Sequence, residues 1–97
     1  MGKTVLVVEN DKEIRRLIAD SLLDAKYSVV KAADSKSAME GFHEFKPDIA
    51  VVDVEQDDID GLELCRQMRS FRNIPVIFLN GDESELEQLQ EIGRAHV

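Results

Sequence analysis

Four short hydrophobic runs are spaced along the chain, and a polar segment follows each one. They occupy residues 5–8, 27–30, 49–52 and 76–79. The runs are mostly β-branched and lack alternating polar positions, which favours strands that are buried on both faces. Strands of this kind are typical of a parallel sheet that is covered by helices.

Hydrophobic residues recur at helical spacing between and after these runs. The four stripes are Ile14, Leu17, Ile18 and Leu22; Ala38, Phe42 and Phe45; Leu64, Cys65 and Met68; and Leu86 and Leu89. Capping residues precede three of them: Asn10 or Asp11, then Asp60, then Asp82. Strands and helices therefore alternate, and right-handed crossovers between the strands predict a doubly wound α/β sheet.

Length and composition fit one small intracellular domain. The chain has 97 residues, of which 43% are hydrophobic, so it can bury a core. No apolar run approaches the roughly 18 residues of a membrane-spanning helix, and the N-terminus lacks a signal-peptide pattern. Cys65 is the sole cysteine and cannot form an internal disulfide. We therefore expect the protein in a reducing cytoplasm.

The charge balance argues against two classes of partner. Twelve basic residues oppose 20 acidic ones, which gives a net charge of −8. A domain this acidic repels the phosphates of DNA and RNA and the surface of anionic membranes. We expect no direct binding of nucleic acid or membrane.

Acids and amides follow three of the predicted strands. Glu9 and Asn10 follow the first, Asp53 ends the third, and Asn80-Gly81 follows the fourth. The carboxyl ends of parallel strands meet at one edge of the sheet, so Glu9 and Asp53 approach each other if their strands are neighbours. Such oxygen ligands suit Mg²⁺, beside which an aspartate can act as a nucleophile toward a phosphoryl group.

A simpler interpretation is that these acids only cap helices. It fits Asp11, Asp60 and Asp82, which directly precede helical stripes. It fits Asp53 poorly, because Asp53 follows a buried strand and lies seven residues before the Asp60 cap.

Four separated motifs resemble the receiver domain of bacterial response regulators in their order and spacing. They lie at residues 5–11, 47–53, 60–64 and 74–77. The resemblance implies a flavodoxin-like sheet of strand order 2-1-3-4, in one receiver domain over residues 1–97. It also implies that the domain is incomplete at its C-terminus, because the family's fifth strand would begin near Val97 and its fifth helix follows that strand.

The resemblance assigns roles residue by residue. Asp53 falls on the phosphoacceptor, and Glu9 and Asn10 fall on the acidic pair that binds Mg²⁺. Glu55 falls where the family uses a backbone carbonyl as a further metal ligand. Asn80 and Gly81 fall on the switch position and on the small residue after it.

The sequence departs from the family pattern at several of these positions. Asn10 stands in place of a metal-ligating Asp, and Asn80 in place of a Thr or Ser hydroxyl. Asp57-Asp58 replaces a Pro-Gly pair, and the lysine that pairs with the phosphoryl group has no match. Losing one negative charge beside a divalent cation costs on the order of 1–4 kcal/mol, or roughly ten- to a thousandfold in Mg²⁺ affinity.

Four functions fit the residues to different degrees. The favoured one is a phosphoacceptor that receives its phosphoryl group on Asp53 from a histidine kinase or phosphotransfer protein and signals to an output domain or effector. Such a chain is not an enzyme beyond weak autophosphorylation and dephosphorylation. The alternative is a degenerate receiver that binds partners without phosphorylation.

Two other classes fit poorly. A haloacid-dehalogenase phosphatase needs a second Asp two residues after its nucleophile, where this chain has Glu55. A flavin-binding domain needs phosphate donors after its first strand, where Glu9, Asn10 and Asp11 would repel a phosphate.

The sequence also predicts the environment of two side chains and one strand. His43 is predicted on a solvated face of its helix, and Cys65 in the core. The apolar run at residues 76–79 would form an open sheet edge, so we expect copies of the chain to associate through it.

Overall fold

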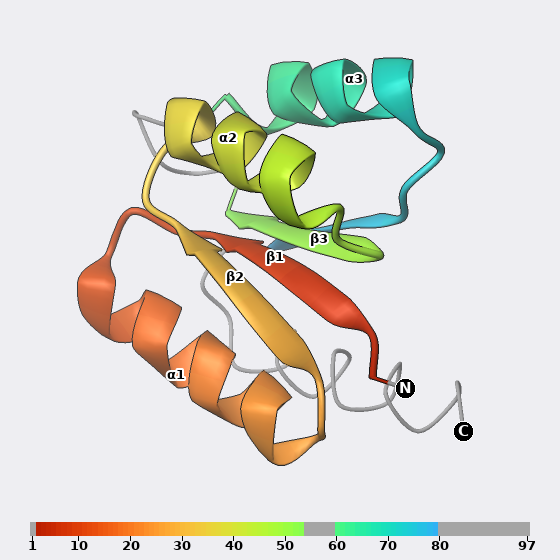
Figure 1. Ribbon diagram of the computed structural model, residues 1–97. Coiled ribbons are helices and arrows are strands. Elements are labelled where there is room, and N and C mark those ends of the chain that lie inside the picture. The colour runs from red at the N-terminus through yellow and green to blue at the C-terminus, as the bar shows by residue number, and fades with distance from the viewer. Residues whose placement is uncertain (1, 54–59, 80–97) are drawn as a thin grey trace.

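The computed structural model describes residues 2–53 and 60–79 (Figure 1). The elements along this part of the chain are β1 (Thr4–Val8), α1 (Lys12–Asp24), β2 (Ser28–Ala32), α2 (Ser35–Phe45), β3 (Ile49–Asp53), α3 (Gly61–Phe71) and β4 (Val76–Leu79). The strands form one parallel sheet of order β2-β1-β3-β4. This confirms the predicted fold class and strand order.

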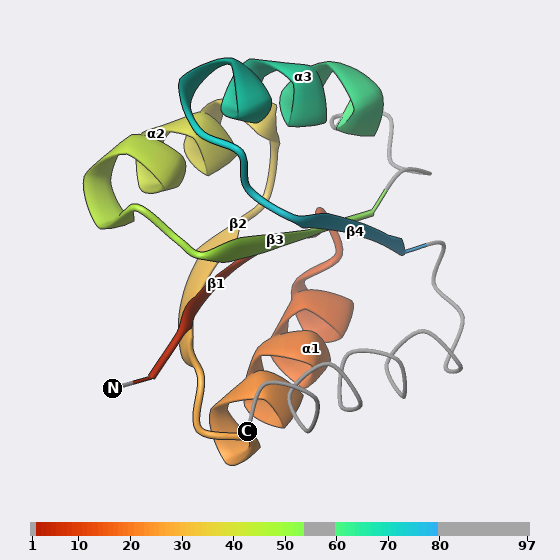
Figure 2. The ribbon, with the colours of Figure 1, turned by 90° about the vertical axis from the view of Figure 1, so that its right-hand side faces the viewer.

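Helices cover both faces of the sheet. Helix α1 lies on one face, and α2 and α3 lie side by side on the other (Figures 1 and 2). The chain runs from β1 outward to β2 and then returns past β1 to β3. The order of the strands therefore reverses between β1 and β3, and in open α/β sheets the working site lies beyond the carboxyl ends of the strands at this point.

Two hydrophobic clusters hold the layers together. The larger one joins the sheet to α2 and α3 through Leu6, Val8, Ala32, Ala38, Phe42, Ala50, Val52, Leu64, Met68 and Ile74. The smaller one joins the opposite face to α1 through Val5, Val7, Ile18, Leu22, Val51 and Leu79. Alternate residues of β1 and β3 enter opposite clusters because successive side chains of a strand point to opposite faces. This explains why both strands read as continuous apolar runs.

An aspartate caps the N-terminus of each described helix. The Asp11 carboxylate accepts hydrogen bonds from the backbone N–H groups of Glu13 and Ile14, at 2.9 and 3.1 Å. The Asp60 carboxylate accepts one from the N–H of Glu63 at 3.1 Å. Both caps were predicted. Asp34 caps α2 through a capping box with Ser37.

The prediction of the helix faces was partly wrong. Ile14 and Leu17 are exposed, the latter to 59%, because α1 meets the sheet through Ile18, Ala19 and Leu22. Phe45 is likewise 55% exposed, because it lies at the last residue of α2.

Smaller corrections concern the outer strands and two side chains. The second strand begins at Ser28 and continues to Ala32, and both outer strands are only partly buried because each has one neighbour among the described strands. Cys65 is half-buried rather than in the core.

His43 is exposed as predicted, but it is not merely solvated. Its ring meets the ring of Phe71 from α3 edge-on, with the centroids 4.6 Å apart.

The remaining sequence predictions fall outside the described residues. They include the predicted fourth helix with Leu86, Leu89 and its Asp82 cap, and the Asp57-Asp58 pair. None of the helices that the structure describes is both long and apolar enough to cross a membrane.

Candidate functional site

Glu9 and Asp53 lie at the point where the strand order reverses. Val8 of β1 is paired in register with Val52 of β3, so the next residue of each chain segment reaches the same sheet edge. Both side chains are buried, with exposed fractions of 1% for Glu9 and 5% for Asp53. The prediction that these two carboxyl groups come together is confirmed.

Burial and proximity strongly disfavour the charged form of Glu9. Its pKa is raised to about 8, first by burial, then by hydrogen bonding to Asp53 and by the charges of Asp53 and Asp11. A hydrogen bond between two carboxyl groups requires that one of them carries a proton. Without that proton, the buried Glu9 carboxylate would be poorly satisfied, because the backbone N–H of Asn10 offsets only part of the rise in its pKa.

Arg15 of α1 holds the backbone just after β1. Its Nη1 donates to the Glu9 carbonyl oxygen at 2.8 Å and to the Asn10 carbonyl oxygen at 3.3 Å. The Asn10 side chain is exposed, and its Nδ2 donates a long hydrogen bond of 3.4 Å to the Ala33 carbonyl. Asn10 thus lies next to the buried pair but on its open side.

The other predicted site residues, Glu55, Asn80 and Gly81, lie outside the described residues. Leu79, the residue before Asn80 in the chain, is paired with Asp53 across β3 and β4. The end of β4 therefore reaches the same sheet edge as the two carboxyl groups.

The two buried carboxyl groups fit a hydrated divalent cation. Among residues 2–53 and 60–79, no group of three or more His, Cys, Asp or Glu side chains gathers as a metal cage. Mg²⁺ does not need one, because it keeps several waters and commonly takes only one or two carboxylates. A cation beside Glu9 would neutralise charge on its buried oxygens and would favour their charged form.

Comparison with known proteins decides the family. The model of the response regulator receiver domain matches residues 5–96. This chain belongs to the response regulator receiver domain family. The match includes Glu9, Asn10 and Asp53, so the resemblance that was based on four motifs is confirmed.

Curated relatives of this receiver domain are longer proteins. The chain is 33% identical over 90 residues to an uncharacterized transcriptional regulatory protein, YrkP of Bacillus subtilis, with 93% of this chain and 38% of that protein covered. It is 31% identical over 88 residues to the response regulator protein GraR of Staphylococcus epidermidis, with 91% of this chain and 39% of that protein covered. The chain thus spans less than two-fifths of the length of these relatives.

Solved structures agree on the fold of the receiver domain. The chemotaxis protein CheY4 of Vibrio cholerae superimposes with a TM-score of 0.79 at 26% identity, over 98% of this chain and 80% of that one. A putative response regulator from Chloroflexus aurantiacus gives a TM-score of 0.75 at 29% identity, over 88% of this chain and 74% of that one.

Sequence reasoning missed Arg15, whose guanidinium fixes the carbonyls of Glu9 and Asn10. A weak signal was available. Arg15 lies one helical turn after the predicted caps Asn10 and Asp11, from where a long side chain can reach back to the preceding loop.

Proposed function

We propose that Asp53 accepts a phosphoryl group from a phosphohistidine on a histidine kinase or phosphotransfer protein, with the help of Mg²⁺. The observation that carries this proposal is the burial of Asp53 beside Glu9 at the switch point of the sheet. Burial beside Asp53 disfavours the charged form of Glu9, and a bound divalent cation relieves the repulsion between the two groups. A purely structural role would favour a neutral or ion-paired side chain at such a buried position.

The proposed transfer exchanges one bond to phosphorus for another. One carboxylate oxygen of Asp53 attacks phosphorus, and a P–O bond forms while the P–N bond to the donor histidine breaks. The electron pair of that bond returns to the imidazole nitrogen. Glu9, the Asn10 side-chain oxygen, Asp53 and the Glu55 carbonyl would hold the Mg²⁺, which when bound neutralises negative charge on the phosphoryl oxygens.

The residues of this chain supply position and environment for the step. The pairing of β1 with β3 sets Asp53 beside Glu9, and burial keeps both carboxyl groups from being solvated as ordinary surface acids. Arg15 fixes the backbone that carries Glu9 and Asn10. On this proposal the chain is a phosphoacceptor and does not turn over a separate substrate.

A second candidate is a receiver that binds its partners without phosphorylation. It is favoured by Asn10, which offers an oxygen to Mg²⁺ but no charge at a position where the family has an aspartate. In either case we propose a cytoplasmic protein that passes a signal to an output domain or effector. Names of relatives such as the transcriptional regulatory protein YrkP support a longer regulatory protein of that kind.

Chemical phosphorylation tests the proposal. The chain is incubated with a small phosphodonor and Mg²⁺, and intact mass and peptide mapping then locate the product. We expect one phosphoryl group on Asp53 and none on an Asp53→Asn variant, whereas Asp20→Asn, at an exposed position on α1, retains labelling. A label on another residue would refute the assignment, and a folded chain that takes up no label at high Mg²⁺ would favour the second candidate.

A further inference from the structure

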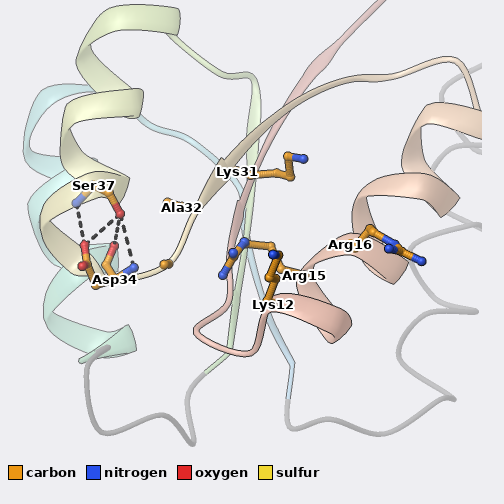
Figure 3. Close-up of a pocket in the computed structure, with 8 residues that line it drawn as sticks. Lys12, Arg15, Arg16, Lys31, Ala32, Asp34 and Ser37 are labelled. Carbon is orange, nitrogen blue, oxygen red and sulfur yellow. Dashed lines mark hydrogen bonds between the residues drawn. The ribbon is translucent and has the colours of Figure 1, made fainter.

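We propose that a groove beside α1 is a second site, which binds a compact, multiply phosphorylated anion. One side of the groove is formed by the first turns of α1, and the other side by the end of β2 and the start of α2 (Figure 3). Its volume is about 450 Å³, and its lining consists of Lys12, Arg15, Arg16, Lys31, Ala32, Ala33, Asp34 and Ser37. The proposal does not depend on Asp53 or on Mg²⁺.

The lining concentrates positive charge in an acidic chain. Half of the eight lining residues are basic, while the whole chain has a net charge of −8. None of these four cations forms an ion pair with a carboxylate in the part of the chain that the structure describes. Four cations that line one hollow without an acidic partner repel one another, and a multivalent anion relieves that repulsion.

Arg15 gives the groove a fixed donor. Its Nη1 is anchored to the carbonyl oxygens of Glu9 and Asn10, so the orientation of its guanidinium plane is set before any ligand arrives. The Nε and Nη2 groups remain as donors on the same rigid plane. A guanidinium held in this way matches two oxygens of a phosphate, and little side-chain entropy is lost on binding.

The single carboxylate in the lining is already engaged. Oδ1 of Asp34 accepts hydrogen bonds of 2.8 Å from both the N–H and the Oγ–H of Ser37, as the dashed lines in Figure 3 show. These bonds hold Asp34 at the cap of α2, on the far side of the groove from Lys12, Arg15 and Arg16 of α1 in that view.

The shape and chemistry of the lining select the kind of anion. The volume is in the range of small-molecule sites, roughly 300–1,000 Å³. Alanine is the largest apolar residue in the lining, so a nucleobase finds no ring to stack on and a peptide finds no pocket for its side chains. A long nucleic acid or acidic peptide would also extend beyond these four cations, and the rest of the chain carries an excess of acids. Several phosphates on a small body therefore fit best.

Calorimetry with inorganic tripolyphosphate tests the site, in Mg²⁺-free buffer at low salt. We expect one site per chain and binding at least about tenfold tighter than that of orthophosphate, because several charges engage together. Binding should weaken steeply as salt is added. Asp53→Asn should leave the affinity unchanged, which separates this site from the proposed phosphoacceptor.

Two double variants with the same loss of charge localise the site. Lys12→Gln/Lys31→Gln removes one cation from each side of the groove and should weaken tripolyphosphate binding at least about tenfold. Lys3→Gln/Lys46→Gln removes two exposed cations outside the lining and should change the affinity less than about twofold. Circular dichroism confirms that both variants are folded.

Three outcomes would overturn the proposal. The first is no measurable binding of tripolyphosphate, and the second is an equal loss of affinity in the two double variants. The third is that hexaglutamate binds as tightly as tripolyphosphate and depends in the same way on Lys12 and Lys31. The third outcome would assign the groove to an acidic protein segment instead.

Discussion

Glu9 stands beside Asp53 because Val8 and Val52 are in register in neighbouring parallel strands. The pairing places two carboxyl groups in a buried position at the sheet edge where the strand order reverses. Burial and the neighbouring acid raise the pKa of Glu9 to about 8. At neutral pH and without a cation, the pair therefore holds a proton that an exposed glutamate would release.

Metal-free stability should fall as pH rises. The raised pKa means that folded Glu9 keeps its proton when the unfolded chain, with an ordinary pKa near 4.5, has lost it. The stabilisation is fully present below about pH 4.5 and is lost progressively as pH approaches 8. Chemical unfolding with EDTA present, followed at several pH values, measures it.

A neutral isostere provides the control for the pH experiment. Glu9→Gln should flatten the decline between these pH values, and Mg²⁺ should restore part of the stability of the unmodified chain. A decline of equal slope in Glu9→Gln would show that other groups cause it.

Asn10→Asp should tighten Mg²⁺ binding. The variant adds a carboxylate beside Glu9 and Asp53, and we expect a gain in affinity of roughly ten- to a thousandfold. Mg²⁺ titrations followed by calorimetry or NMR at constant pH measure the change. Asp20→Asn changes one charge on the exposed surface of α1, away from the site. It serves as a control and should leave the Mg²⁺ affinity nearly unchanged. An unaltered affinity in Asn10→Asp would contradict the placement of Asn10 at the metal site.

Phe42 should contribute far more to stability than Phe45 from the same helix. Phe42 is 2% exposed within the larger cluster, so Phe42→Ala should lower the free energy of unfolding by about 3–5 kcal/mol. Phe45 is 55% exposed, and Phe45→Ala should cost only about 0.5 kcal/mol. Urea unfolding of the two variants measures the difference, and equal losses would contradict the packing of α2 described above.

Gly41 should be intolerant of a methyl group. A Cβ at this position would lie 2.9 Å from Cγ1 of Val30 and 3.7 Å from Cδ1 of Leu6. Alanine improves helix propensity by about 1 kcal/mol, but overpacking costs about 1–3 kcal/mol, so Gly41→Ala should destabilise the fold by about 1 kcal/mol. In a Val30→Ala background the same change should be neutral or stabilising. If Gly41→Ala alone stabilises the fold, α2 must lie farther from β2 than these distances indicate.

Copies of the chain should associate through β4. Among the described strands β4 pairs only with β3, and Phe78 is partly exposed. Sedimentation equilibrium over a wide range of concentration should show dimers, which Ile77→Lys should dissociate. Val29→Lys is a matched control, because Val29 is also half-buried against the smaller cluster but lies on β2 at the other edge. A folded monomer at high concentration would contradict this prediction, and circular dichroism must accompany each variant.

The sequence by itself determined the elements and their order. Local periodicity marks apolar runs such as residues 49–52, and local hydrogen bonds favour caps such as Asp11 and Asp60. Both patterns can be recognised in the sequence alone. The alternation of strands and helices then limits the topology to one sheet with a predictable working edge. Glu9 and Asp53 could be assigned to that edge because strand ends are fixed by the same local pattern.

Only the tertiary structure decided which side chains are buried and which segments meet. The angle at which α1 meets the sheet leaves Ile14 and Leu17 exposed, although they share a helical stripe with Ile18 and Leu22. The shift in the Glu9 pKa likewise arises from burial and from a residue 44 positions away in the chain. The basic groove joins α1 to Lys31 of β2, and no local pattern connects them. These properties depend on distances between elements, which local sequence preferences do not encode.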